Sequence, residues 1–402
     1  MVAVWATRDL IPLYGLYALY FSDHGLSTGE ISSLLVIWSV TGFLLEIPSG
    51  AWADTVDRRA LLVLGGGVYA AAFSSWMLWP TYAGIALGFV LWGASGAVMS
   101  GTFEALVHDE LTARGEADGY AQLIGWSHSA AMAANVLATL AAAPLFAWGG
   151  YAVVGWTSVG VALLHTLLAT RLPAAPAVAD VAEEPAGRYL AMLRTGLREA
   201  LRHRRVRGGV VVVALVLGCS AYDEYFGLVV RDHGAAIAQV PLVVGVIGVG
   251  ELIGTALAGR TARTSARTMA LLVALSAAAI SAGALARPLW AVAALIGAGY
   301  GVLDNAMVVA EARLQAVISG PARATVTSVS AISMEVVALS VYGFMALGTT
   351  WWSTATVLAL WGVPVLGIAL VTWRLLPEVA PVSDRSAPGA RRDHARRTDG
   401  RA

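Results

Sequence analysis

Acidic side chains stand in the middle of long apolar stretches of this sequence. Asp223 and Glu224 lie eight and seven residues before Arg231, and Asp9 lies twelve residues before Phe21. An ionisable side chain in such a setting is costly, and it commonly marks a path for an ion or a substrate. A carboxyl group in a dry cavity can bind and release a proton near neutral pH. We therefore take these three carboxyl groups as the leading candidates for proton coupling. We expect only one of the adjacent pair to face a cavity, because helix neighbours point about 100° apart.

Other polar and aromatic side chains in these stretches have two interpretations each. Arg8 either binds an anionic part of a substrate or neutralises Asp9 in a structural ion pair. His128 either shuttles protons or bonds to a backbone carbonyl. Tyr14 and Tyr17 either line an aromatic cavity or serve only in helix packing. The remaining cavity candidates are Asn135, Asp304 and Glu335, and Glu104 is expected about one turn from the inner end of its helix.

No pattern of metal ligands, nucleophile motif or nucleotide-binding loop is visible in the chain. The single cysteine, Cys219, excludes an intramolecular disulfide. The glycine-rich stretches 245–254 and 297–301 follow no strand and precede no GK[ST] sequence, so they predict close helix packing and not a phosphate-binding loop. We expect no metal site, no cofactor, no nucleic-acid partner and no enzyme activity.

The elements that carry these side chains are long and apolar. The chain has 402 residues, of which 58% are hydrophobic and 13% charged. Stretches of roughly 20 apolar residues can cross the hydrocarbon core as helices. The sequence therefore predicts an all-α integral membrane protein with twelve transmembrane helices. They are expected at 3–21, 31–53, 60–79, 83–107, 120–146, 150–171, 208–230, 238–258, 268–286, 289–310, 324–347 and 352–373.

The arginines predict the orientation of these helices. Alternate connections hold 23 of the 26 arginines, and the opposite set holds only Arg231 and Arg287. The positive-inside rule makes the arginine-rich connections cytoplasmic. Both termini are then cytoplasmic, and the chain is a multi-pass protein of the inner cell membrane. Tryptophans at the predicted outer ends fit an interfacial belt, namely Trp79, Trp148, Trp290, Trp351 and Trp352. The first apolar stretch lacks a basic leader and a cleavage site, so it is expected to be a retained helix.

The two halves of the chain repeat each other. Ser22-Asp23-His24-Gly25 closes the first predicted helix, and Arg231-Asp232-His233-Gly234 closes the seventh. Glu46 and Glu251 each stand eight residues before a short basic loop. Ordered matches at nearly one shift indicate duplication of a six-helix unit. We expect six-helix bundles at 1–171 and 208–376, a cytoplasmic linker at 172–207 and a disordered cytoplasmic tail at 377–402. The linker from Tyr189 is amphipathic and basic, which fits a helix on the membrane surface or a solvated linker helix.

The sharpest motif follows the second predicted helix. Gly50, Asp54, Arg58 and Arg59 match the signature loop of the major facilitator superfamily, whereas Asp57 replaces the usual glycine. Arg323-Ala-Thr-Val-Thr-Ser328 is similar to the family's loop before the eleventh helix. With twelve spans, the repeat and the central linker, the chain resembles this superfamily over about residues 1–376.

The resemblance implies an alternating-access transporter whose first, fourth, seventh and tenth helices line the central path. It implies that Asp54 engages the start of the eleventh helix and nearby arginines such as Arg323 when the inner side is closed. Asp57 and Arg58 are expected to add ion pairs to this inner lock. Glu46 and Glu251 are assigned either to the inner interface between the bundles or to ion coupling, and the same choice stays open for Glu335.

We expect a secondary transporter, monomeric in the bilayer, that exports a small amphipathic compound in exchange for protons. The alternative is proton-coupled or facilitated uptake of a polar metabolite, and a membrane enzyme or sensor is more remote. An enlarged apolar cavity favours export, whereas a compact cavity with polar groups converging on Arg8 favours uptake. The substrate itself is not predicted.

Overall fold

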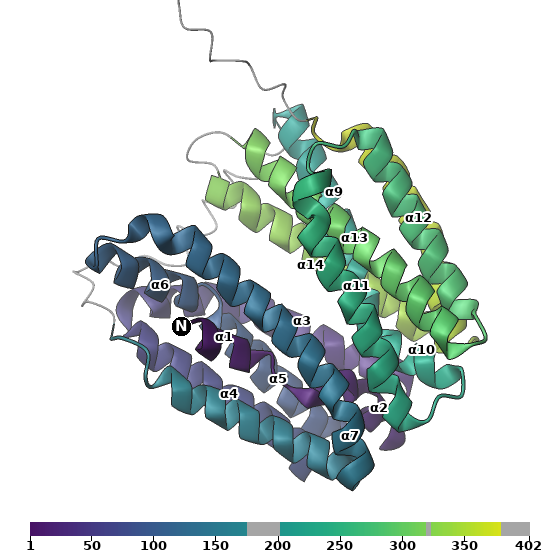
Figure 1. Cartoon of the computed structure of the whole chain (residues 1–402), viewed down its shortest axis with the longest axis horizontal. Coiled ribbons are helices and arrows are strands. Elements are labelled where there is room, and N and C mark those ends of the chain that lie inside the picture. Colours follow the sequence, from purple (N-terminus) through teal and green to yellow (C-terminus); the bar gives the residue numbers. More distant parts are fainter. Residues whose placement is uncertain (175–201, 319–322, 379–402) are drawn as a thin grey trace, which may run out of the picture.

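The chain folds into two helical bundles that lie side by side (Figure 1). The computed structural model describes residues 1–174, 202–318 and 323–378, and within these ranges it contains helices and no strand. The N-terminal bundle consists of α1 (Val2–Arg8), η1 (Pro12–Gly15), α2 (Tyr17–Asp23), α3 (Thr28–Thr55), α4 (Arg58–Leu78), α5 (Tyr82–Met99), α6 (Thr102–Ala113), η2 (Ala117–Gly119) and α7 (Tyr120–Ala169). The C-terminal bundle consists of α9 (Arg204–Gly218), η3 (Cys219–Tyr225), α10 (Phe226–Asp232), η4 (Ile237–Gln239), α11 (Val240–Thr261), α12 (Ala266–Leu285), α13 (Leu289–Val317), α14 (Arg323–Gly348) and α15 (Thr354–Leu375). The amphipathic part of the linker and the C-terminal tail fall largely outside the described residues.

The membrane-spanning architecture agrees with the prediction. Ten helical segments of the described chain are long and apolar enough to cross a membrane. One of them contains α7, which joins the predicted fifth and sixth spans across a kink where Gly150 adopts φ +62°. The first predicted span is divided among α1, η1 and α2, so no part of it reaches the length of a membrane-crossing helix. Twelve crossings are therefore consistent with the ten long segments.

Three predicted spans are not continuous α-helices. The first is interrupted at Pro12, which has no N–H to donate to the preceding turn. The fourth ends at Met99 and resumes after Gly101, whose φ of +71° favours glycine. It then continues to Ala113, so Glu104 lies in the first turn of the second piece. The prediction that Glu104 lies about one turn from the end of its helix is therefore wrong. The seventh tightens into the 3₁₀ segment η3.

The signature motif is mostly helical, which corrects its prediction as a loop. Helix α3 runs to Thr55, so Gly50 and the following residues form its last turns. Only two residues separate α3 from α4, and the second is Asp57. Its side chain caps α4 by accepting from the Arg59 N–H at 3.3 Å. The short connection therefore follows from an N-cap that starts the next helix at once.

The two bundles contact each other in one half of their length. We call the end that carries Arg58, Arg114, Arg260 and Arg263 the arginine end, and the other the far end. Ser32 and Tyr225 bond across the bundles at 2.7 Å near the far end. A Cβ on Gly245 would lie 2.4 Å from Leu140, so α11 and α7 also touch closely there. Toward the arginine end the ribbons of α7 and α11 separate (Figure 1).

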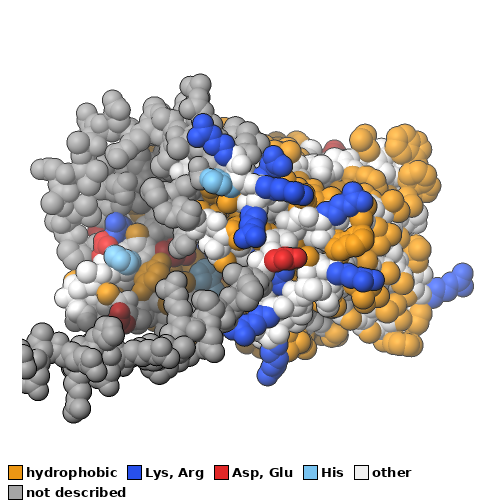
Figure 2. Space-filling model, turned by 90° about the horizontal axis from the view of Figure 1, so that it is seen from above, with side chains coloured by type: hydrophobic (Ala, Val, Ile, Leu, Met, Phe, Trp, Pro, Cys, Tyr) orange, Lys and Arg blue, Asp and Glu red, His pale blue; other side chains and the backbone are white. Residues whose placement is uncertain are grey.

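Arginine and tryptophan side chains are concentrated at opposite ends of the molecule. Seen from above, arginine side chains gather on one part of the molecule while apolar side chains cover its flank (Figure 2). The far end exposes tryptophans, among which Trp148 is 81% and Trp290 75% accessible. This distribution is typical of a protein whose flank meets lipid and whose tryptophans lie at an interface.

Arg313 ties helix ends together inside the C-terminal bundle. It lies in the last turns of α13, is 5% exposed, and donates to the carbonyls of Ala262, Thr264 and Pro377. These carbonyls follow helix ends and would otherwise lack donors. We expect Arg313→Ala to lower the free energy of unfolding by about 2–4 kcal/mol, because buried acceptors of charged hydrogen bonds lose their donor.

Thermal unfolding of purified protein in detergent measures this effect. Arg374→Ala is the matched control, since Arg374 lies at the same end but is exposed. Equal melting temperatures for the two variants would contradict the assigned role of Arg313.

Candidate functional site

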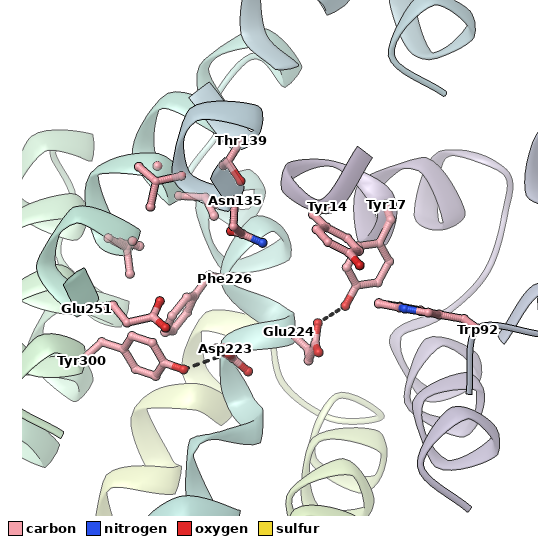
Figure 3. A pocket seen from close by; sticks show the side chains of 15 residues that line it. Tyr14, Tyr17, Trp92, Asn135, Thr139, Asp223, Glu224, Phe226, Glu251 and Tyr300 are labelled. Carbon is pink, nitrogen blue, oxygen red and sulfur yellow. Dashed lines mark hydrogen bonds between the residues drawn. The ribbon is translucent and has the colours of Figure 1, made fainter. Parts of the chain in front are cut away.

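A cavity of about 250 Å³ lies between the two bundles (Figure 3). Its walls are aromatic and acidic, and both bundles contribute to it. The N-terminal bundle supplies Tyr14, Tyr17, Trp92, Asn135, Val136 and Thr139, and the C-terminal bundle supplies Asp223, Glu224, Phe226, Val244, Gly245, Ile247, Gly248, Glu251 and Tyr300. Of the predicted cavity residues, the structure thus brings together Tyr14, Tyr17, Asn135, Asp223 and Glu224.

Two of the three interrupted spans, the first and the seventh, meet at this cavity. Tyr14 lies in η1, and Asp223 and Glu224 lie in η3. The sequence shift of 209 between the halves places Tyr14 and Asp223 at equivalent positions of the repeat. In η3, Ser220 donates its hydroxyl to the Leu217 carbonyl at 2.7 Å, a side-chain bond of the kind that competes with the α-helical ladder. Interrupted helices near the membrane midplane commonly form transporter binding sites.

Both carboxyl groups of the adjacent pair line the cavity, which corrects the expectation that only one does. Asp223 accepts from the Tyr300 hydroxyl at 2.8 Å, within the C-terminal bundle. Glu224 accepts from the Tyr17 hydroxyl, which belongs to the N-terminal bundle. The prediction failed because the cavity extends around this segment: Asp223 turns toward Tyr300 of its own bundle and Glu224 toward Tyr17 of the other.

Glu251 also faces the cavity. It forms no hydrogen bond with any described residue, and its carboxyl group points toward the space between Tyr300 and Phe226 (Figure 3). From the sequence, Glu251 was assigned either to the inner interface between the bundles or to ion coupling. The structure places it in the same cavity as Asp223 and Glu224. Three carboxyl groups therefore share the site, and none of its lining residues is basic.

Aromatic rings form the wall opposite these carboxyl groups. Tyr14 stacks on Trp92 with ring centroids 5.4 Å apart. Trp92 also contacts Trp38 at 5.1 Å. The Tyr14 hydroxyl bonds to that of Tyr69, which donates to the Arg8 carbonyl at 3.0 Å. These ring contacts and hydrogen bonds hold Tyr14 and Trp92 in place beside the cavity.

Arg8 lies in a second cavity, of about 420 Å³, between the bundles. There it shares the lining with Glu46, Glu335 and Ser39. Ser39 donates to Glu335, which makes a second bond from the N-terminal bundle to a carboxyl group of the C-terminal bundle. The Arg8 guanidinium lies 4.9 Å from the ring centre of Trp5. It forms no ion pair with Asp9, which was one of the two interpretations that the sequence left open.

The remaining intramembrane candidates lie apart from both cavities. Asp304 is 7% exposed and accepts from Thr255 inside the C-terminal bundle. His128 lies 3.7 Å from Glu104, and its ring meets that of Trp5 edge to face. Asp9 ends α1 and lines neither cavity.

The described part of the inner lock stays within the N-terminal bundle. Arg58 pairs with Asp109 and donates to the Ala105 carbonyl at 3.2 Å. Arg59 donates to the Leu172 carbonyl at 3.4 Å. Asp57 caps α4 and lies 3.9 Å from the Arg59 guanidinium, so the ion pairs described for Asp57 and Arg58 lie within the N-terminal bundle. The structure does not describe the surroundings of Gly50 or the side chains of Asp54 and Arg323.

Sequence reasoning missed several residues of the central cavity. Trp92, Phe226 and Thr139 lie in uniformly apolar runs, where nothing in the sequence shows which helix face turns inward. Tyr300 had a weak signal, since it is a polar aromatic residue within the glycine-rich stretch 297–301.

Comparisons with known proteins agree with this geometry. The family described as Major Facilitator Superfamily matches residues 4–332. A search of curated proteins finds no match. Among solved structures, an inward-facing bacterial homologue of the iron transporter ferroportin is 15% identical, with a TM-score of 0.65 over 92% of this chain and 94% of that one. The nucleoside transporter NupG is 9% identical, with a TM-score of 0.76 over 93% and 98%. A D-xylose–proton symporter is 16% identical, with a TM-score of 0.67 over 94% and 95%.

At these identities the likeness shows the fold alone. The matched family covers most of the chain, including both broken segments and all three cavity carboxyl groups. The chain is a membrane transporter, not an enzyme, and it belongs to the major facilitator superfamily.

Proposed function

We propose that the chain exports a small amphipathic compound in exchange for protons. The observation that carries this proposal is the hydrogen bond from Tyr17 to Glu224, which joins the two bundles at the cavity. A hydroxyl bonds more strongly to an ionised carboxylate than to a neutral carboxylic acid. Ionised Glu224 therefore holds the far half closed, and neutralising it releases that contact.

This arrangement supports exchange because two kinds of ligand can neutralise the site. A proton or a bound substrate weakens the Tyr17–Glu224 contact, whereas an empty, ionised cavity keeps it. Only the loaded transporter then changes its open end, which is the condition for obligatory exchange. The titratable groups facing Glu224 are Asp223 and Tyr225 on its own segment, Tyr14 and Tyr17 from the first broken span, Glu251 on α11, Tyr300 on α13 and Tyr342 on α14.

Uptake of a polar metabolite through groups converging on Arg8 has less support. The central cavity is compact, but Arg8 does not line it. We further propose that the arginine end faces the cytoplasm, that the transporter resides in the inner membrane, and that it works as a monomer without a cofactor.

Everted membrane vesicles containing the protein test the proposed exchange. A pH-sensitive dye records whether any compound of a panel collapses an imposed proton gradient, with vesicles lacking the protein as reference. We expect at least one amphipathic compound to do so only when the protein is present. If no compound moves protons, yet a labelled polar metabolite equilibrates across the membrane, uptake or facilitated diffusion replaces export.

A further inference from the structure

The central cavity combines negative groups with aromatic side chains, and none of its lining residues is a cation. Asp223, Glu224 and Glu251 line it together, and no Arg or His side chain does. Ionised carboxylates enclosed in one cavity repel one another, and the low dielectric makes this repulsion costly. The site is therefore most stable when a positive charge enters it.

The wall opposite these carboxyl groups indicates what kind of cation fits. The carboxyl groups belong to the C-terminal bundle, whereas Tyr14, Tyr17 and Trp92 face them from the N-terminal bundle (Figure 3). The face of an aromatic ring attracts a cation within about 6 Å, and weakly hydrated quaternary ammonium groups are bound by aromatic cages in this way. A bare metal ion gains little from such a wall, because it prefers to replace its water with oxygen, nitrogen or sulfur ligands.

The polar partners of the carboxyl groups argue against a metal ion as well. Tyr17 and Tyr300 already bond to Glu224 and Asp223, and neutral phenols are poor metal ligands. Among the residues that the structure describes, no group of three or more His, Cys, Asp or Glu side chains is arranged to hold a metal. The free carboxyl group of Glu251 remains available to a diffuse positive charge.

We propose that the substrate is a small organic cation with an aromatic or apolar body. This inference rests on the proposed function, because it assigns a substrate class to the same cavity. The ammonium group lies between the three carboxyl groups and the aromatic wall of Tyr14, Tyr17 and Trp92, and the apolar body packs along that wall. The cation thereby contacts both bundles and supplies the neutralising charge that weakens the Tyr17–Glu224 bond.

Three compounds with the same benzyl body test the charge preference. They are benzyltrimethylammonium, its uncharged carbon isostere neopentylbenzene, and the anion phenylmethanesulfonate. Binding of radiolabelled benzyltrimethylammonium to the purified full chain in detergent is measured at one fixed pH, and the other two compounds serve as competitors. We expect saturable binding of the cation and competition at least ~10-fold weaker from the neutral and anionic compounds.

Variants locate the binding to the cavity. Glu251→Gln is expected to weaken cation binding roughly 10-fold or more, the effect of losing one charged partner. Trp92→Leu is expected to weaken it about 5- to 30-fold while narrowing the difference between the cation and its neutral isostere. Glu311→Gln is the control, because Glu311 is exposed near the arginine end of α13 and lines neither cavity. Thermal unfolding of each variant verifies that it is folded.

The outcomes separate this inference from the proposed exchange. If neutral or anionic amphipaths move protons in vesicles while the cation does not bind, the substrate class is wrong and the exchange stands. If the cation binds as expected but moves no protons, the substrate class stands and the exchange is wrong. Displacement of the cation by Mn²⁺ or Zn²⁺ at micromolar concentration, with loss of the Trp92 effect, would overturn the assignment in favour of a metal ion.

Discussion

Glu224→Gln is expected to reduce substrate-driven proton movement ~100-fold or more, the scale of removing an essential proton-transfer group. Glutamine has nearly the same shape, and its amide oxygen still accepts from Tyr17, but it cannot carry a proton or a negative charge. The contact between the bundles then no longer depends on loading, because its strength is the same in every state. Transport down a substrate gradient should persist in part, since the cavity itself remains.

The measurement compares two assays on the same vesicles. Dye-detected proton movement reports coupling, and efflux of preloaded labelled compound without a pH gradient reports passage alone. Glu311→Gln provides a carboxyl-to-amide change away from both cavities and should match the native protein in both assays. Tyr17→Phe keeps the carboxyl group but removes the cross-bundle donor, so it should retain binding and lose tight coupling. Full coupling in Glu224→Gln would remove Glu224 from the mechanism.

Gly254→Ala is expected to lower the free energy of unfolding by about 3 kcal/mol or more. The added methyl group would clash with backbone atoms of the neighbouring helix, which cannot move away as a flexible side chain can. Helices α11 and α13 cross here at very short distance. A Cβ on Gly254 would lie 1.9 Å from the Gly301 carbonyl oxygen, and one on Gly250 would lie 2.2 Å from that of Gly297. The two helices would have to separate, and α11 carries Glu251 while α13 carries Tyr300.

Gly259→Ala is the matched control on the same helix. A Cβ there meets nothing within 4 Å, so this change should be neutral or stabilise the helix by up to ~1 kcal/mol. Thermal unfolding in detergent compares the two variants with the native protein. A stable Gly254→Ala protein would mean that the close crossing of α11 and α13 does not limit stability.

The sequence predicts the membrane crossings well because they follow from the length of each apolar run, which does not depend on how the helices pack. The sequence repeat also corresponds to repeated structure, since Ser22–Gly25 and Arg231–Gly234 lie at the ends of the equivalent helices α2 and α10. The intramembrane carboxyl groups stand out for the same reason, because each is a charge in an apolar run. Asp223 and Glu224 could therefore be proposed for the site from the sequence alone.

The rotation of each helix is not encoded in a run that is apolar all round. Trp92 and Phe226 face the cavity, but their neighbours in sequence are equally apolar, so no periodic pattern distinguishes the inward face. Glu251 was given two interpretations because its distance from the basic loop was known and its direction was not. The break at η3 likewise depends on tertiary contacts such as Tyr17–Glu224 and Tyr300–Asp223, which join distant segments.

The distances between spin labels at the two ends test most directly whether the charge of Glu224 controls which end is open. In a background with Cys219→Ser, one pair of labels at positions 116 and 263 spans the arginine end, and another at 83 and 287 spans the far end. Double electron–electron resonance then follows both pairs across pH. The account predicts that acidification, or Glu224→Gln at any pH, shortens the arginine-end distance and lengthens the far-end distance, while Glu311→Gln behaves like the native protein. Distances that respond to pH equally in the native protein and in Glu224→Gln would contradict it.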